Sequence, residues 1–231
     1  MSQRKPRRFL AIREILDPRD RSVEPMLRLF ASSFPPAERE PYHVLREQLR
    51  TVNSWSHGEP APYRHFVMEA DPQSPTAAGM VRGALLPSGI GFIVHVAVAR
   101  PLRGLSLGER LVRHAIHAFQ ADAEKLDIPY YGTIFEVERV EDARDPQQKL
   151  VREQRLRFFA RLGATILTSD YTQPSMAPGL PPVPLNLLWL ETRPGLARPT
   201  IIKDFYRDAF GLGPAHPYVR RALGLPEIEA V

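Results

Sequence analysis

The sequence contains no cysteine among its 231 residues. This absence excludes disulfide bonds, thiolate nucleophiles and metal sites built on cysteine. Long apolar runs are also absent, so the sequence offers no candidate for a membrane-spanning helix, and its N-terminus lacks the apolar core of a secretory signal. We therefore expect a cytoplasmic protein with no metal site and no membrane association.

Two common phosphate-binding patterns are missing as well. The sequence has neither the Gly-x-x-x-x-Gly-Lys-Ser/Thr string of a P-loop nor the Gly-x-Gly-x-x-Gly string of a dinucleotide-binding turn. A phosphate-binding site in this protein would have to use a different loop.

The charge balance is basic, with 31 Lys and Arg against 26 Asp and Glu and a formal net charge of +5. Part of the excess lies in an opening basic segment (Arg4, Lys5, Arg7, Arg8), and no aromatic residue precedes Phe9. A basic tail can contact nucleic acid, but without interleaved aromatic residues the pattern does not favour nucleic-acid binding. The basic balance also suits a strongly anionic small ligand.

The stretch from Gly91 to Gln120 organises the chain. A β-branched apolar run predicts a buried strand, which Pro101 ends. Ser106 with Glu109 three residues later is a capping-box signature for a helix start. The helix is predicted by apolar residues at helical spacing (Leu107, Leu111, Val112, Ala115, Ile116, Phe119). Free N–H groups at this helix start, together with Arg103, would suit a pyrophosphate.

The rest of the chain predicts an α/β domain with a mixed sheet. Before the central strand we expect, in order, a strand over 9–16, helices from 22 and from 41, and strands over 64–70 and 78–86. After the central helix we expect a strand over 130–137, a helix capped by Asp145 and ended by Gly163, a strand over 164–168, a proline-rich excursion over 170–184, a strand over 185–191 and two short helices.

Two stretches resemble the GNAT superfamily of N-acetyltransferases. The string from Arg103 to Gly108, after Val-x-Val-x-x-Pro, resembles that family's acetyl-CoA loop, Gln/Arg-x-x-Gly-x-Gly/Ala, with Ser106 in place of the middle glycine. A serine there still offers its backbone N–H, provided that its φ is negative. The string 155–164 resembles the second signature, Phe-Tyr-x-x-x-Gly-Phe, with Phe159 in place of the tyrosine.

The resemblance covers roughly residues 9–192 and implies a GNAT-like acyl-CoA N-acyltransferase fold, with a central mixed, mostly antiparallel, twisted sheet flanked by helices. We therefore divide the chain into a basic tail (1–8), a GNAT domain (9–192) and a C-terminal helical extension (193–231). The extension packs either onto the domain or onto a neighbouring subunit, and together with Trp189 it offers apolar surface for a homodimer.

The same resemblance implies a binding site for acetyl-CoA as co-substrate. Backbone groups of Val96 and Val98 would bind the pantetheine arm and polarise the thioester carbonyl. The amides that would hold the pyrophosphate belong to Arg103, Gly104, Leu105, Ser106, Leu107 and Gly108.

Acetyl transfer to an amine also needs a base and a proton for the leaving thiolate. The candidate base is Glu136, which would form an acidic patch with Glu138, Glu141 and Asp142 unless these are ordinary surface carboxylates. Because Phe159 cannot donate a proton, the candidate acid is Tyr171, with Tyr131, Tyr206 or solvent as alternatives. His95 is either a proton relay or a hydrogen-bonded core histidine.

These observations predict an acetyl-CoA-dependent N-acetyltransferase that acts on a primary amine of a small molecule or peptide by direct attack in a ternary complex. The alternative is a non-catalytic GNAT-fold protein that binds acyl-CoA as a sensor or interaction module. The partners expected are acetyl-CoA and an amine acceptor, with no membrane and no nucleic acid, in a monomer or a homodimer.

Overall fold

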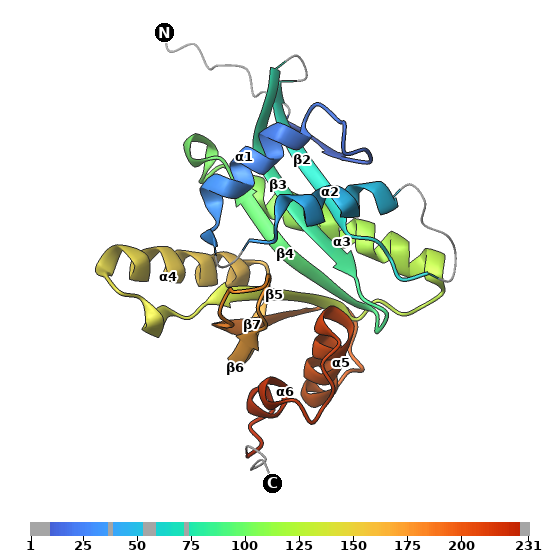
Figure 1. Ribbon diagram of the computed structural model, residues 1–231, viewed down its shortest axis with the longest axis vertical. Coiled ribbons are helices and arrows are strands. Elements are labelled where there is room, and N and C mark those ends of the chain that lie inside the picture. Colours follow the sequence, from blue (N-terminus) through green and yellow to red (C-terminus); the bar gives the residue numbers. More distant parts are fainter. Residues whose placement is uncertain (1–9, 37–38, 53–58, 72–73, 227–231) are drawn as a thin grey trace.

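A seven-stranded sheet in the order β1-β2-β3-β4-β5-β7-β6 forms the centre of the computed structural model (Figure 1). The structure describes residues 10–36, 39–52, 59–71 and 74–226, so the predicted basic tail lies outside the described residues. The strands are β1 (Ala11–Glu14), β2 (Arg64–Asp71), β3 (Ser74–Leu85), β4 (Ile90–Val98), β5 (Gly132–Glu138), β6 (Thr165–Gln173) and β7 (Val183–Glu191). Among these strands β4 and β5 pair in parallel and the other neighbours are antiparallel, which confirms the predicted mixed, mostly antiparallel sheet.

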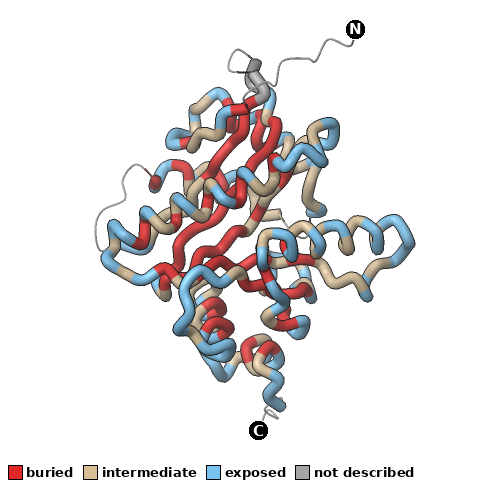
Figure 2. The backbone as a smooth tube through the Cα atoms, turned by 180° about the vertical axis from the view of Figure 1, so that it is seen from behind, coloured by how far each residue is buried: buried red, intermediate tan, exposed pale blue. Residues whose placement is uncertain are grey.

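Helices cover both faces of this sheet. They are α1 (Val23–Ser33), α2 (Tyr42–Thr51), α3 (Leu107–Leu126), α4 (Pro146–Arg161), α5 (Arg198–Phe210) and α6 (Pro217–Ala222), with 3-10 turns η3 (Arg100–Leu102) and η4 (Val140–Asp142). Figure 1 shows α1 and α2 on one face of β2–β4 and α3 on the other, and the view from behind shows the buried strands beneath α3 (Figure 2). None of the described helices is long and apolar enough to cross a membrane.

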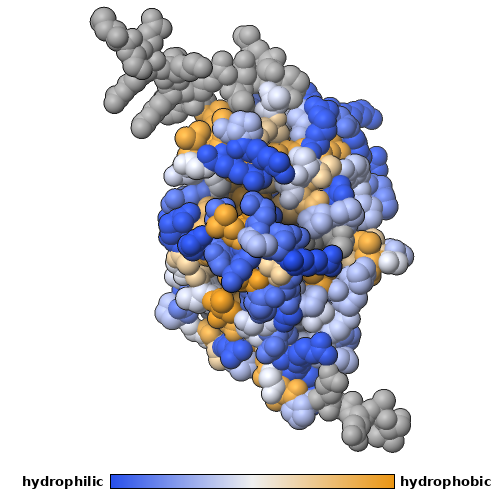
Figure 3. Space-filling view, turned by 90° about the vertical axis from the view of Figure 1, so that its left-hand side faces the viewer, coloured by the Kyte–Doolittle hydropathy of each residue, from blue (hydrophilic) through white to orange (hydrophobic). Residues whose placement is uncertain are grey.

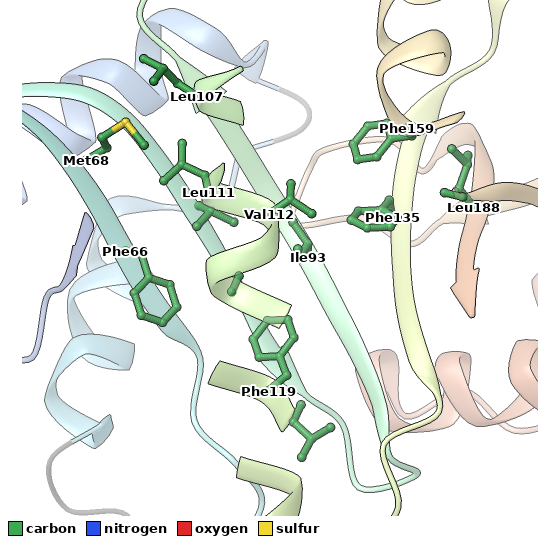
Figure 4. Packing of buried hydrophobic residues seen from close by; sticks show 14 of the residues in the cluster. Phe66, Met68, Ile93, Leu107, Leu111, Val112, Phe119, Phe135, Phe159 and Leu188 are labelled. Carbon is green, nitrogen blue, oxygen red and sulfur yellow. The ribbon is translucent and has the colours of Figure 1, made fainter. Parts of the chain in front are cut away.

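The apolar face of α3 forms the main core with the back of the sheet. Leu111, Val112 and Phe119 are fully buried, as the helical spacing of these residues predicts. They lie against Phe66 and Ile93 of the strands (Figure 4). This packing fixes the start of α3 beside the end of β4, which is where the candidate phosphate-binding loop lies.

The two C-terminal helices pack onto the sheet of their own chain. On α5 the residues Ile201, Ile202, Phe205 and Tyr206 are buried in a second core that also contains Trp189. The apolar surface that the sequence analysis offered to a homodimer is therefore largely covered within the monomer.

Local sequence signals correctly predicted where α4 begins and ends. The Asp145 side chain accepts a hydrogen bond from the Gln148 backbone N–H at 2.8 Å, as an N-cap does. Gly163 follows the helix with a φ of +96°, a left-handed conformation that favours glycine at a helix end.

The predicted end of the strand over 164–168 was wrong. The proline-rich excursion was predicted to begin at residue 170, but β6 continues to Gln173 and pairs with β7 at Tyr171↔Leu185 and Gln173↔Val183. Register shifts interrupt this pairing between Ile166 and Thr168 and again before Tyr171. Such bulges break the alternation of inward and outward residues, so the sequence pattern of a strand is lost there.

Candidate functional site

A cavity of about 480 Å³ opens where β4 and β5 separate. The two strands pair only from Ile90↔Gly132 to Ile93↔Phe135, although both continue beyond that point. A register shift in the β3–β4 pairing accompanies the separation, because Gly83 pairs with Ile93 whereas Arg82 pairs with His95. Strand, helix and loop residues from both halves of the sheet line the resulting space.

The edge of β4 that faces this cavity presents backbone polar groups. The Ala99 N–H donates to the Ala78 carbonyl of β3 at 2.9 Å, so alternate residues of β4 turn their backbone groups toward β3. By the same alternation, Val96 and Val98 turn theirs toward the side from which β5 has diverged, and both residues line the cavity. Arg103 Nε donates to the Val98 carbonyl at 3.1 Å. The structure thus brings the predicted Val96, Val98 and Arg103 together.

The loop from Arg103 to Gly108 forms one end of the cavity. The residues that line it are Arg103, Gly104, Ser106, Leu107 and Gly108, whereas the Leu105 side chain is 61% exposed and lies outside the lining. An added Cβ at Gly108 would lie 3.3 Å from the ring of Phe158, so this glycine permits the close approach of α3 and α4.

The condition on the φ of Ser106 is not met, and the capping box expected there was wrong. Its φ is +57° rather than negative, and its side chain makes no capping hydrogen bond. Glu109 instead accepts a hydrogen bond from Arg113 Nε at 2.9 Å, so the predicted capping box does not form. The reason is the left-handed turn at Ser106, whereas an N-cap residue needs an extended backbone to bring its side chain back to the helix N–H groups.

Glu136 lies on the β5 wall of the cavity, partly buried. Its carboxylate accepts hydrogen bonds from the Tyr171 hydroxyl and from Gln173 Nε2, the latter at 2.8 Å. Tyr171 is 1% exposed, packs against the rings of Phe205 and Tyr206, and is not one of the lining residues. Burial, reinforced by the charge of Glu136, raises the pKa of Tyr171 well above its ordinary value of 10.

Gln173 was not among the predicted site residues. Its side chain is 4% exposed and lines the cavity beside Glu136. The strand pattern breaks before this residue, and its partner is distant in sequence, so no sequence signal pointed to it.

The alternative tyrosines lie away from the cavity. The Tyr206 hydroxyl donates to the Thr172 carbonyl at 3.0 Å, and Tyr131 packs against the second core, which contains the buried residues of α5. Among the lining residues that the structure describes there is no tyrosine. Phe159 packs against Phe135 with ring centroids 4.6 Å apart (Figure 4) and serves the core.

The predicted acidic patch is divided by ion pairs. Glu138 lines the cavity but forms an ion pair with Arg155 of α4. In the η4 turn, Asp142 forms an ion pair with Arg139 at 2.7 Å. Glu136 is therefore the carboxylate that combines a place in the cavity wall with hydrogen bonds from neutral side chains.

Arginine side chains line the α4 side of the cavity. Arg155 and Arg161 line it from α4, and Arg103 lines it from the loop before α3. The surface at the end of the molecule that carries α4 is mostly hydrophilic, with apolar side chains in small separate groups (Figure 3). No group of His, Asp or Glu side chains within the described ranges could hold a metal ion.

His95 lines the cavity from β4 and belongs to a buried polar row across the sheet. The strand register places His65, Arg82 and His95 opposite one another on β2, β3 and β4. His95 Nδ1 lies 3.3 Å from an Arg82 nitrogen, which supports the interpretation of His95 as a hydrogen-bonded buried histidine. Arg82 also forms an ion pair with Glu40.

Comparisons with known proteins agree with this architecture. The sequence model described as the Acetyltransferase (GNAT) family matches residues 23–130. None of the curated proteins matches the chain.

Among solved structures, the chain is similar to a Bacteroides thetaiotaomicron protein described as a GNAT-family acetyltransferase, with 20% identity, a TM-score of 0.60 and coverage of 88% of this chain and 99% of that one. A Desulfovibrio desulfuricans protein that is also described as a GNAT-family acetyltransferase has 18% identity and a TM-score of 0.52, with coverage of 79% of this chain and 98% of that one. The PaiA N-acetyltransferase of Thermoplasma acidophilum, solved in complex with coenzyme A, has 10% identity, a TM-score of 0.51 and coverage of 79% and 100%. At these identities the likeness concerns the fold.

Proposed function

We propose that this chain, whose residues 23–130 match the acetyltransferase (GNAT) family model, is an N-acetyltransferase that transfers the acetyl group of acetyl-CoA to a primary amine of a small molecule or peptide. The observation that carries the proposal is the cavity between β4 and β5, with backbone polar groups on one strand and Glu136 on the other. A thioester and an amine can approach each other between these two walls.

The residues present suit a ligand with a pyrophosphate and an amide-bearing arm. Backbone groups of Val96 and Val98 face the open side of β4, where a pantetheine amide can bond to the strand edge. Arg103 and Arg161 would balance the phosphate charges. The co-substrate supplies an activated acetyl thioester, and the protein supplies the binding and the base.

Glu136 is the proposed general base. The amine binds as an ammonium and gives one proton to the Glu136 carboxylate, which Tyr171 and Gln173 hold in position. The amine nitrogen then forms the new N–C bond, and the C–S bond breaks. The sulfur takes up the second amine proton, and Glu136 returns its proton to solvent.

We assign Tyr171 to positioning Glu136 rather than to protonating the sulfur. Its hydroxyl donates to the Glu136 carboxylate, and its side chain does not line the cavity. Water entering the cavity would then carry the proton to the leaving thiolate, whose ordinary pKa of about 8.5 makes it a tolerable leaving group near neutral pH.

The first test is thermal unfolding with and without acetyl-CoA, in parallel with thiol release in a panel of amines. At one hundred times its dissociation constant a ligand adds about 2.7 kcal/mol of stability. For a protein of this size that corresponds to a rise in Tm of about 5–10 °C. A shift with thiol release supports the enzyme, whereas a shift without release across polyamines, amino acids and peptides favours the non-catalytic sensor. No shift refutes coenzyme binding.

The second test removes the proposed base. We expect Glu136→Gln to lower kcat about 100-fold or more, the usual effect of losing a general base, with an unchanged dissociation constant for acetyl-CoA. Glu138→Gln is the matched control, because this carboxylate also lines the cavity but forms an ion pair with Arg155. Equal rates for the Glu136→Gln variant and the parent protein across the pH range would remove Glu136 from the mechanism.

A further inference from the structure

One buried polar atom in the cavity wall has no hydrogen-bond partner among the described residues: Oε1 of Gln173. The amide nitrogen of the same side chain donates to Glu136 Oε2 at 2.8 Å, which fixes the end of the amide that carries the oxygen. A buried acceptor without a donor is unfavourable. The unpaired oxygen therefore indicates a donor group on a ligand.

The other residues of the cavity wall define the chemistry of that ligand. Glu136 offers a carboxylate beside the amide, so two acceptors, one of them charged, occupy the same part of the wall. Phe34 and Leu185 add apolar surface to the lining. A cation with several N–H groups and a short apolar chain matches this combination.

We propose that Gln173 Oε1 is the second acceptor of a binding site for a primary ammonium group and selects acceptors with several N–H groups over those with one. This inference rests on the proposed function, because it assigns a substrate-selecting residue to the same site. A primary ammonium has three N–H groups and can donate to Glu136 and to Gln173 at once. After one proton passes to Glu136, the remaining bond to Gln173 orients the lone pair of the amine nitrogen.

The test compares n-butylamine with N,N-dimethylbutylamine. Both carry one positive charge at neutral pH and share the same chain, but the protonated tertiary amine has a single N–H. Binding to the full-length protein is measured by ligand-observed NMR titration, with and without saturating coenzyme A. One additional hydrogen bond predicts that the parent protein prefers the primary amine by about three- to tenfold.

Two variants separate the roles within the site. Gln173→Met keeps the length of the side chain but removes both amide atoms, and we expect it to bind the two amines equally. Tyr171→Phe removes only the hydroxyl donor to Glu136 and is the matched control, which should keep the preference. A general loss of affinity lowers both titrations together and leaves their ratio unchanged, so the ratio reports selection rather than damage to the fold.

An unaltered preference in Gln173→Met, equal binding of both amines by the parent protein, or no binding of n-butylamine at millimolar concentration would each overturn the inference. Thiol release together with an unaltered ratio in Gln173→Met refutes the role of Gln173 and leaves the proposed function standing. Failure to bind acetyl-CoA refutes the proposed function, and the titrations without coenzyme still decide the role of Gln173.

Discussion

His65 makes the stability of this protein depend on pH in a way that a single substitution can remove. The side chain is fully buried on β2, and neither ring nitrogen has a hydrogen-bond partner among the described residues. Burial, together with the charge of Arg82 and the nearby His95, lowers the pKa of His65 well below its ordinary value of 6.5. In the folded protein the ring therefore stays neutral as the solution becomes mildly acidic.

The sign of the effect follows from proton binding. Below pH 6.5 the unfolded chain binds a proton at His65 and the folded protein does not, so acid favours unfolding. Above pH 6.5 the free energy of unfolding is not reduced by His65, and it decreases as the pH falls below that value. With an unfolded pKa of about 6.5, the free energy of unfolding decreases between pH 8 and pH 5 through this residue, by at most about 2 kcal/mol, the limit for a folded ring that binds no proton by pH 5.

The assay is urea unfolding followed by circular dichroism at pH 8 and pH 5. We expect His65→Leu to lose less stability than the parent protein over this interval, by up to about 2 kcal/mol. At pH 8 the variant should be more stable by about 1 kcal/mol, because an apolar side chain replaces two unpaired nitrogen atoms. His43→Leu, a substitution at an exposed histidine of α2, is the control and should follow the parent protein. An equal pH-dependent loss in His65→Leu and in the parent would refute the reasoning.

Two further predictions concern backbone conformation and close approach. Ser106→Gly should stabilise the protein by about 0.5–1 kcal/mol. A left-handed serine costs about 1–2 kcal/mol, and the added freedom of glycine in the unfolded chain offsets about 0.5–1 kcal/mol of that gain. The control Ser32→Gly, within helix α1, should instead destabilise the protein by about 0.5 kcal/mol. Gly83→Ala should destabilise by about 3 kcal/mol or more, because its Cβ would lie 2.2 Å from the Phe92 carbonyl oxygen, whereas Gly213→Ala, with nothing within 4 Å of its Cβ, should stay within about 0.5 kcal/mol of the parent. Urea unfolding at pH 8 measures all four, and a stable Gly83→Ala or a destabilised Ser106→Gly would contradict these arguments.

The sequence predicted those parts of the site that depend on local signals. The apolar run to Val98, Pro101 and the helical spacing after Leu107 correctly placed the strand, the loop and the helix, since each pattern is complete within a few residues. The left-handed backbone conformation of Ser106 could not be predicted from these local patterns. A serine is compatible with either sign of φ, and the choice depends on how η3 and α3 are held by the rest of the protein.

The parts that depend on register could not be predicted. His65, Arg82 and His95 meet because β2, β3 and β4 align at one level, and a shift of one residue would separate them. Gln173 reaches Glu136 only because β6 continues past its bulges along β7. Both sets of contacts depend on how separate strands align, so they cannot be predicted from composition or from residue spacing.

The cavity itself follows from how the sheet is paired. β4 is held by β3 as far as Val98, and β5 is held by β7 as far as the pairing of Glu138 with Leu185. Each strand of the β4–β5 pair is therefore anchored on its outer side beyond the point where their mutual pairing stops at Ile93 and Phe135. Closing the gap would require one strand to leave its outer partner and lose several ladder hydrogen bonds. The opening between Val96 and Glu136 is thus maintained by the backbone of both half-sheets, and side-chain substitutions in the lining can change what it binds without closing it.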